Sequence, residues 1–174
     1  MLKKKNTDAP SFDWHANYTY DEFLEKKEVV INDSGFEVDE EDLSPYLFDY
    51  QKDIIRWALR KGKAAVFEDT GLGKTIQQLQ WATLVNKFTN KPVMIFAPLA
   101  VSKQTVLEGE RFKLPVNLCE SQEDVINGVN ITNYEKIHKF DTDTFSGVVL
   151  DESSILKSYS GKTTQDMINR FRFT

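Results

Sequence analysis

Residues 64–75 read AAVFEDTGLGKT, and this stretch decides the fold. A short apolar run over 64–68 is followed by two glycines and then by a helical pattern over 75–88. Gly71 and Gly73 allow the tight turn that exposes backbone N–H groups, and the helix that follows directs the positive end of its dipole to the same place. A strand, a glycine-rich loop and a helix in this order indicate a loop that binds phosphate.

The side chains at the end of this loop have the chemistry that a nucleoside triphosphate requires. Lys74 would neutralise the β- and γ-phosphates, and the Thr75 hydroxyl would ligate Mg²⁺. The full GxxxxGK[ST] pattern requires glycine at position 68, where this chain has Glu68. A glycine-rich turn that happens to precede Lys-Thr is the alternative, and the strand–loop–helix context argues against it. The loop residues predicted to bind ATP are Asp69, Thr70, Gly71, Leu72, Gly73, Lys74 and Thr75.

A phosphate-binding loop works with a second, acidic site that holds magnesium and polarises water. Residues 147–152 read GVVLDE, an apolar strand that ends in Asp151 and Glu152. Ligands of an open parallel sheet gather at the carboxyl ends of its strands, so the two motifs converge if their strands are neighbours. Asp151 is predicted to coordinate Mg²⁺ with Thr75, and Glu152 to act as the general base. An acidic turn at a strand end is common in proteins. Asp151 and Glu152 therefore indicate a magnesium site only in combination with the loop that carries Lys74.

The rest of the chain alternates strand and helix patterns. The strands are apolar throughout rather than at every second residue, which is typical of a parallel sheet covered by helices on both faces. The fold class is therefore predicted to be α/β. A helix is expected to begin with Asp49 as its N-cap and to stop at Gly62. Strands are further predicted at 93–98, 116–120 and 129–132, and helices at 20–27, 100–112, 121–127, 134–140 and from Thr163.

Composition limits the functions that are available. The formal net charge of −5 argues against DNA binding by bulk charge alone, although basic side chains can cluster locally. One cysteine, Cys119, excludes an internal disulfide and is interpreted as a packed hydrophobe. Neither a secretory leader nor a membrane-spanning run is recognised, so a cytoplasmic protein without membrane contacts is expected. Residues 1–45 are interpreted as an N-terminal extension and a solvated acidic linker, and 46–174 as the folded domain.

With these motifs the chain resembles the superfamily 2 helicases, and within them the Swi/Snf-type branch. GLGKT is the form of the loop that this branch favours, and Asp151-Glu152 matches motif II, which reads DESS here where the DEAD/DEAH-box families have DEAD or DEAH. DESS followed by ILK, and the stretch from Phe48 to Thr75, are similar to helicases carried by bacteriophages. Residues 46–174 are thereby identified as a first RecA-like P-loop NTPase domain, incomplete at its C-terminus.

The resemblance also implies contacts outside the loop. Gln51 resembles the glutamine of the Q motif, which reads the edge of adenine, and Phe48 would either stack on the base or pack in the core. FAPLAVSKQ, from Phe96, resembles motif Ia, and ITNYEKI, from Ile131, resembles motif Ib. Ordinary loops are the alternative for both. The side chains implied along a nucleic-acid backbone are Pro98, Ser102, Gln104, Thr132, Asn133 and Tyr134.

The implied activity is that of an ATP-dependent DNA helicase or translocase that uses ATP and Mg²⁺ and binds duplex DNA, in a bacterial host cell if the chain is of phage origin. A second RecA-like domain would supply the arginines that stabilise the transition state, so little turnover is expected without it. A DEAD-type RNA helicase and a non-catalytic interaction module are the alternatives. A GTPase is disfavoured because Asn90-Lys91 is followed by Pro-Val rather than completing NKxD, and no kinase lid with arginines is recognised.

Overall fold

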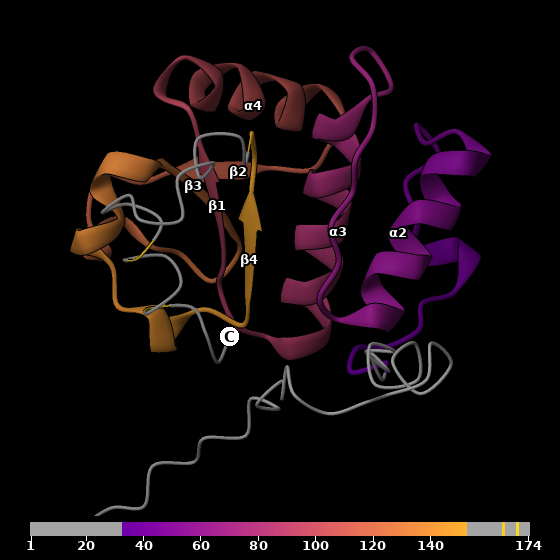
Figure 1. The fold of residues 1–174 in the computed structure, drawn as a ribbon, viewed down its shortest axis with the longest axis horizontal. Coiled ribbons are helices and arrows are strands. Elements are labelled where there is room, and N and C mark those ends of the chain that lie inside the picture. Colours follow the sequence, from indigo (N-terminus) through magenta and orange to yellow (C-terminus); the bar gives the residue numbers. More distant parts are fainter. Residues whose placement is uncertain (1–32, 153–164, 166–169, 171–174) are drawn as a thin grey trace, which may run out of the picture. The chain divides into compact units, whose positions relative to one another are not determined.

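The computed structural model describes residues 33–152, 165 and 170 (Figure 1). The chain divides into two units, 1–32 and 33–174, and every described residue belongs to the second. The helix predicted over 20–27 lies outside the described residues, and of the last predicted helix only Gln165 and Arg170 are described, both helical. Within the described range, no helix combines the length and apolar character that crossing a bilayer requires.

Four parallel strands form one sheet in the order β2-β3-β1-β4. Their bounds are Val93–Ala97 for β1, Val116–Leu118 for β2, Val129–Asn133 for β3 and Gly147–Leu150 for β4. In the register of the sheet, Ala97 is opposite Asn133 and Phe96 is opposite Leu150. The carboxyl ends of β1, β3 and β4 therefore lie side by side at one edge of the sheet. The predicted α/β fold with a parallel sheet is confirmed.

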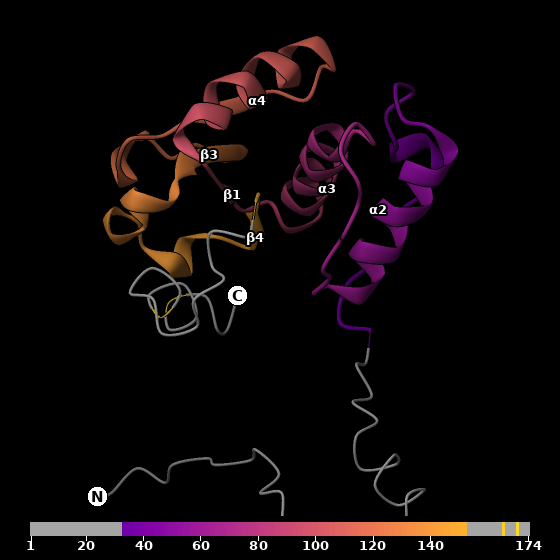
Figure 2. The ribbon, with the colours of Figure 1, turned by 45° about the horizontal axis from the view of Figure 1, so that its top comes forward.

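The central strand β1 is fully buried because its side chains alternate between two cores. Val93, Ile95 and Ala97 pack with side chains of α3, Lys74–Thr89, and α4, Leu99–Arg111. Met94 and Phe96 pack on the opposite face with the segment that contains η3, Tyr134–Lys139, and η4, Thr142–Thr144. Figures 1 and 2 show the long helices on one side of the sheet and the short 3₁₀ turns on the other.

The strand predicted at 64–68 is wrong, because the structure assigns no strand there. Val66 and Phe67 are 42% and 90% exposed, so this apolar segment is not in the core. Composition alone favours a strand at this position, but a strand also requires a neighbouring backbone that pairs with it. Among the described strands, β4 is the outermost strand next to β1, and β1 is its only partner. No described strand pairs with the other side of β4.

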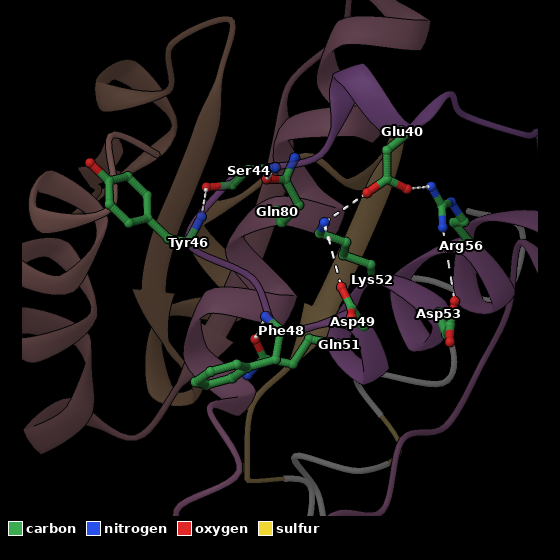
Figure 3. Close-up of polar contacts among 10 residues, drawn as sticks. All are labelled: Glu40, Ser44, Tyr46, Phe48, Asp49, Gln51, Lys52, Asp53, Arg56 and Gln80. Carbon is green, nitrogen blue, oxygen red and sulfur yellow. Dashed lines mark hydrogen bonds and ion pairs between the residues drawn. The ribbon is translucent and has the colours of Figure 1, made fainter.

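Helix α2, Asp49–Lys61, carries the segment that resembles the Q motif. The helix begins one residue earlier than expected, because Phe48 rather than Asp49 occupies the N-cap position. The Phe48 N–H donates to the side-chain oxygen of Gln51 at 2.9 Å, so the glutamine performs the capping (Figure 3). The helix ends at Gly62 with a positive φ of 75°, as the sequence predicts.

The acidic stretch before α2, interpreted from sequence as a solvated connector, packs on the domain from Asp33 onward. Leu43 and Leu47 are each 6% exposed and belong to the main core. Glu40, in the short 3₁₀ turn η1 (Glu40–Asp42), forms ion pairs with Lys52 and Arg56 of α2 (Figure 3). Exposed ion pairs stabilise little, whereas burial of each leucine contributes about 1.5–3 kcal/mol. The apolar contacts therefore hold this stretch, and the charges set its register on α2.

Asn130, the second residue of β3, is fully buried and has its hydrogen-bonding groups satisfied. Its side-chain oxygen accepts from the Ile126 N–H and the Asn117 amide, both at 3.0 Å. Its amide donates to the carbonyls of Ile126 at 3.0 Å and Gly128 at 3.1 Å. Asn130 thus ties the loop before β3 to β2 and β3, and the loop depends on this side chain for its backbone hydrogen bonds.

The single cysteine, Cys119, lies buried beside Asn130, with its thiol 3.4 Å from the side-chain oxygen of Asn130. Burial, and to a smaller extent the negative charge of Asp124, raises the pKa of Cys119 to about 11. The thiol therefore remains protonated at neutral pH. Cys119 packs with Met94 and Phe96, as its interpretation as a small hydrophobe predicts.

We expect Asn130→Ala to lower the free energy of unfolding by about 2–4 kcal/mol, because it leaves several buried backbone groups without partners. Urea denaturation followed by circular dichroism measures the change. Asn127→Ala is the matched control, because Asn127 is exposed and bonds only to the side chains of Asn86 and Asn90. A loss at Asn130 no larger than that at Asn127 would contradict the role given to this network.

Candidate functional site

The glycine-rich loop has the backbone conformation that its sequence requires. Gly71 and Gly73 have φ angles of 84° and 76°, in the left-handed region that other residues rarely adopt. Gly73 is also the N-cap of α3, and a Cβ at this position would lie 2.5 Å from the side-chain nitrogen of Gln51. Conformation therefore requires glycine at position 73, and a larger residue there would also displace the end of the Gln51 side chain. A Cβ at Gly71 would meet nothing within 4 Å, so conformation alone requires glycine there.

Lys74 is the first residue of α3, and its side chain bends back over its own loop. The ammonium group donates to the backbone carbonyl of Asp69 at 2.9 Å and to that of Glu68 at 3.1 Å. No acidic residue occurs in the first turn of α3, so the positive end of the helix dipole is not neutralised from within the helix. Thr75 follows Lys74 in the same turn. The amine and the helix end thus supply positive charge at one place.

Glu68, which stands where the longer pattern has glycine, connects the loop to α3. Its carboxylate accepts from the Gln77 side-chain amide at 2.8 Å, and the same amide nitrogen donates to the Leu72 carbonyl at 3.3 Å. Gln77 is 5% exposed, and its amide oxygen has no hydrogen-bond partner among the described residues. Sequence reasoning did not identify Gln77, although its place on the buried side of the helix directly after the loop could have indicated it.

The start of α2 contacts the same loop through two neighbouring side chains. The Gln51 amide and the Tyr50 hydroxyl each donate to the Leu72 carbonyl at 2.9 Å. Gln51 is 3% exposed, whereas Phe48 is 68% exposed, which removes core packing as an interpretation of Phe48. The rings of Phe48 and Tyr50 are nearly parallel, with centroids 6.1 Å apart. The sequence indicated Phe48 and Gln51 through the Q motif but gave no sign of Tyr50.

Asp151 directly follows β4 and lies against the N-terminal part of α3. Hydrogen bonding to the Gln78 side chain and, to a smaller extent, the positive charge of Lys74 lower the pKa of its carboxyl group. Lys74 and Gln78 are one helical turn apart and so lie on the same face of α3. Burial raises the pKa of Asp151, and these two side chains partly oppose that rise. The charge of Lys74 thus acts on the carboxyl group at the end of β4.

The backbone around Asp151 is held from two sides. Its N–H donates to the Phe96 carbonyl at 2.8 Å, and its carbonyl accepts from the Tyr134 hydroxyl at 2.7 Å. Glu152 follows with a φ of 54°, an uncommon conformation for a residue other than glycine. The chain therefore turns sharply at the end of β4, and Glu152 is exposed there. Ser153, Ser154 and the residues after them up to 164 lie outside the described range.

The carboxyl edge of the sheet also contains a small hollow of about 40 Å³, between the start of α4 and the ends of β2 and β3. Ser102, Thr132 and Asn133, three of the side chains implied along nucleic acid, line it together with Lys103 and Lys136. The Thr132 hydroxyl and the Asn133 amide oxygen are buried and have no hydrogen-bond partner among the described residues. Glu120 also lines the hollow and forms an ion pair with Lys136.

The other three side chains implied along nucleic acid lie elsewhere. Pro98 is the N-cap residue of α4, at the carboxyl end of β1. Gln104 is exposed on α4 and donates to Glu108 at 3.0 Å. Tyr134 is 5% exposed and turns its hydroxyl to Asp151 rather than to the surface. The hollow therefore gathers three of the six residues, together with two lysines that the sequence analysis did not single out.

No protein-family model matches the chain. It is 30% identical over 148 residues to the Xenopus tropicalis protein named SWI/SNF-related matrix-associated actin-dependent regulator of chromatin subfamily A-like protein 1, a match that covers 76% of this chain and 15% of that protein. The Xenopus laevis protein of the same name is 30% identical over 124 residues, which cover 64% of this chain and 13% of its own length. The chain thus spans a small part of the relatives it matches. These matches support a relationship between this chain and the Swi/Snf-type helicases.

Proposed function

We propose that this chain is the ATP-binding domain of an ATP-dependent DNA translocase or helicase. One observation carries the proposal: Asp151, at the end of β4, is near enough to Lys74, at the start of α3, for the Lys74 charge to lower its pKa, and Lys74 follows a glycine loop with two left-handed residues. An amine, a helix N-terminus and a carboxylate around one loop are the groups that bind a metal–triphosphate. The relationship to Swi/Snf-type proteins supports the same function.

The residues at this place fit Mg²⁺ and ATP. The Thr75 hydroxyl and the Asp151 carboxylate would hold Mg²⁺, a hard cation that takes oxygen ligands and keeps waters and phosphate oxygens around it. When bound, Mg²⁺ neutralises charge on the phosphates. Lys74 would leave the two loop carbonyls that it now contacts and bind the phosphates. Glu152 would accept a proton from the attacking water.

Turnover by this chain alone is expected to be very slow. In this mechanism arginines that a second RecA-like domain supplies stabilise the transition-state charge, an effect on the order of 10³ or more in rate. ATP binding does not need them, because the loop, Lys74 and Asp151 all belong to this chain. Binding of nucleotide is therefore the direct test of the proposal, and hydrolysis without a second domain is a test of its mechanism.

We expect Lys74→Ala to weaken the binding of Mg²⁺–ATP at least about tenfold, which corresponds to ~1.4 kcal/mol, because it removes the cation that pairs with the phosphates. Isothermal titration calorimetry with and without EDTA measures both this loss and the need for metal. Lys87→Ala is the matched control, because Lys87 lies on the same helix but pairs with Asp42. Absence of ATP binding in the wild-type chain, or equal affinity in Lys74→Ala, would refute the proposal.

We expect Gln51→Ala to weaken ATP and GTP binding by similar factors, on the order of tenfold. Gln51 acts on the loop through the Leu72 carbonyl, and its side-chain oxygen already accepts from Phe48, so its loss loosens the loop whichever base is bound. Competition of each nucleotide against a fluorescent ATP analogue measures the two affinities. A selective loss of ATP would instead support reading of the adenine edge, the role that resemblance to the Q motif implies.

The hollow at the carboxyl edge is the proposed contact with the nucleic-acid backbone. Lys103 provides positive charge in this lining, whereas Lys136 is paired with Glu120, which also lines the hollow. Duplex DNA is the favoured substrate, because the curated relatives are named as regulators of chromatin. The alternative, a DEAD-type RNA helicase, predicts tighter binding to RNA. Binding of matched DNA and RNA duplexes separates the two.

We expect Lys103→Ala to weaken duplex DNA binding for all sequences alike and to reduce the salt slope of log K by about one, because one phosphate contact is lost. Fluorescence anisotropy over a series of salt concentrations gives both values. Lys91→Ala is the matched control, an exposed lysine before β1 and so at the amino edge of the sheet. Equal salt slopes for the wild type and Lys103→Ala would contradict a backbone contact at this hollow.

A further inference from the structure

Tyr134 connects the hollow at the carboxyl edge of the sheet to Asp151 at the end of β4. It is the first residue of η3, directly after β3, and its ring packs beside Phe96 of β1 with centroids 6.1 Å apart. From there its hydroxyl reaches past the end of β1 and donates to the Asp151 carbonyl at 2.7 Å. The side chain thus spans from the end of β3 to the end of β4, across the strand that lies between them.

The hydrogen bond is made to a particular peptide group. The carbonyl of Asp151 belongs to the peptide that joins Asp151 to Glu152, so Tyr134 fixes the orientation of the link between the two acidic residues. Glu152 holds an uncommon positive φ directly after this peptide, and such conformations persist only where surrounding contacts enforce them. Burial and the charges of Asp151 and Glu152 raise the pKa of Tyr134, so its hydroxyl keeps its proton and remains a donor.

The other end of the same segment faces the hollow. Thr132 and Asn133 immediately precede Tyr134 and line the hollow. A ligand that binds in the hollow therefore contacts the two residues directly before Tyr134. Three consecutive residues, Thr132 to Tyr134, and the hydrogen bond from Tyr134 to the Asp151 carbonyl connect the hollow to the acidic pair.

We infer that Tyr134 is a positioning residue that couples occupancy of the hollow to the orientation of Asp151 and Glu152. The inference rests on the proposed function, because it takes the hollow as the nucleic-acid contact and the acidic pair as part of the ATP site. It assigns Tyr134 a role different from the nucleic-acid contact that motif Ib implies. A purely structural tyrosine would contribute to stability but not to the dependence of one ligand on the other.

The test is a binding cycle on the full chain. The dissociation constant of a fluorescent, non-hydrolysable ATP analogue with Mg²⁺ is measured without DNA and with saturating short duplex DNA, for the wild type and Tyr134→Phe. We expect DNA to change the wild-type affinity by about fivefold or more, and by less than about twofold in Tyr134→Phe.

Tyr46→Phe is the matched control, because the Tyr46 ring is exposed and contacts Phe112 rather than Asp151. It should retain the wild-type response to DNA. Linkage requires that ATP change DNA affinity by the same factor, so the reverse titration gives a second value. If Tyr134→Phe does not fold, the wild-type cycle can still overturn the inference, because independent binding of the two ligands contradicts it.

The outcomes separate the two claims. A wild-type chain that binds the analogue and DNA independently of each other overturns this inference and leaves the proposed function intact. The inference is likewise overturned if Tyr134→Phe retains the full response to DNA. Failure of the wild-type chain to bind the analogue, or to bind DNA, overturns the proposed function itself.

Discussion

The parallel pairing of β1 with both β3 and β4 is the constraint on which the site depends. Val93, Ile95 and Ala97 face one core, and Met94 and Phe96 face the other. A shift of the register by one residue would exchange these two sets, so burial on both faces fixes the register strongly. The ends of the three strands are therefore fixed relative to one another, and the edge on which Asn133 and Asp151 lie follows from the core.

Helix α3 adds the second part of the geometry, because three of its side chains contact three different partners. Lys74 binds the carbonyls of its own loop, Gln77 binds Glu68, and Gln78 binds Asp151. The helix packs on the sheet through residues such as Leu79 and Ala82, both completely buried. The loop is thereby positioned by a rigid element on one side and by Gln51 on the other. Precision at the loop thus comes from packing at some distance from it.

The sequence predicted the four strands and the helices α3 and α4 well, because local patterns determine them, whereas the helix predicted over 121–127 is a short 3₁₀ turn, Gln122–Asp124. The strands beginning at Val93, Val116, Val129 and Gly147 and the helices α3 and α4 lie close to their predicted bounds. The segment 64–68 was predicted wrongly, because pairing with another strand is not a local property. The packing of the acidic stretch before α2 was also missed, since its charges pair with lysines and arginines that the fold brings near.

The candidate site likewise has some features that the sequence predicted and others that it did not. The place of Asp151 could be inferred from a general rule, that ligands gather where parallel strands end, whereas the segment before the glycine loop forms no strand. The parts played by Gln77, Gln78 and Tyr50 could not, because glutamines and tyrosines on a helix carry no signal until their partners are known. Tyr134 shows the limit most clearly: its motif suggested an exposed contact, and the ring is buried with its hydroxyl on a backbone carbonyl.

The environment of Cys119 has a practical consequence for spectroscopy on this protein. With a pKa of about 11, roughly one thiol in ten thousand is ionised at pH 7, and the sulfur is covered by the core. Maleimide dyes and spin labels react with exposed thiolates, so the native chain offers them no competing target. One cysteine engineered on the surface can therefore carry a fluorophore without first removing Cys119.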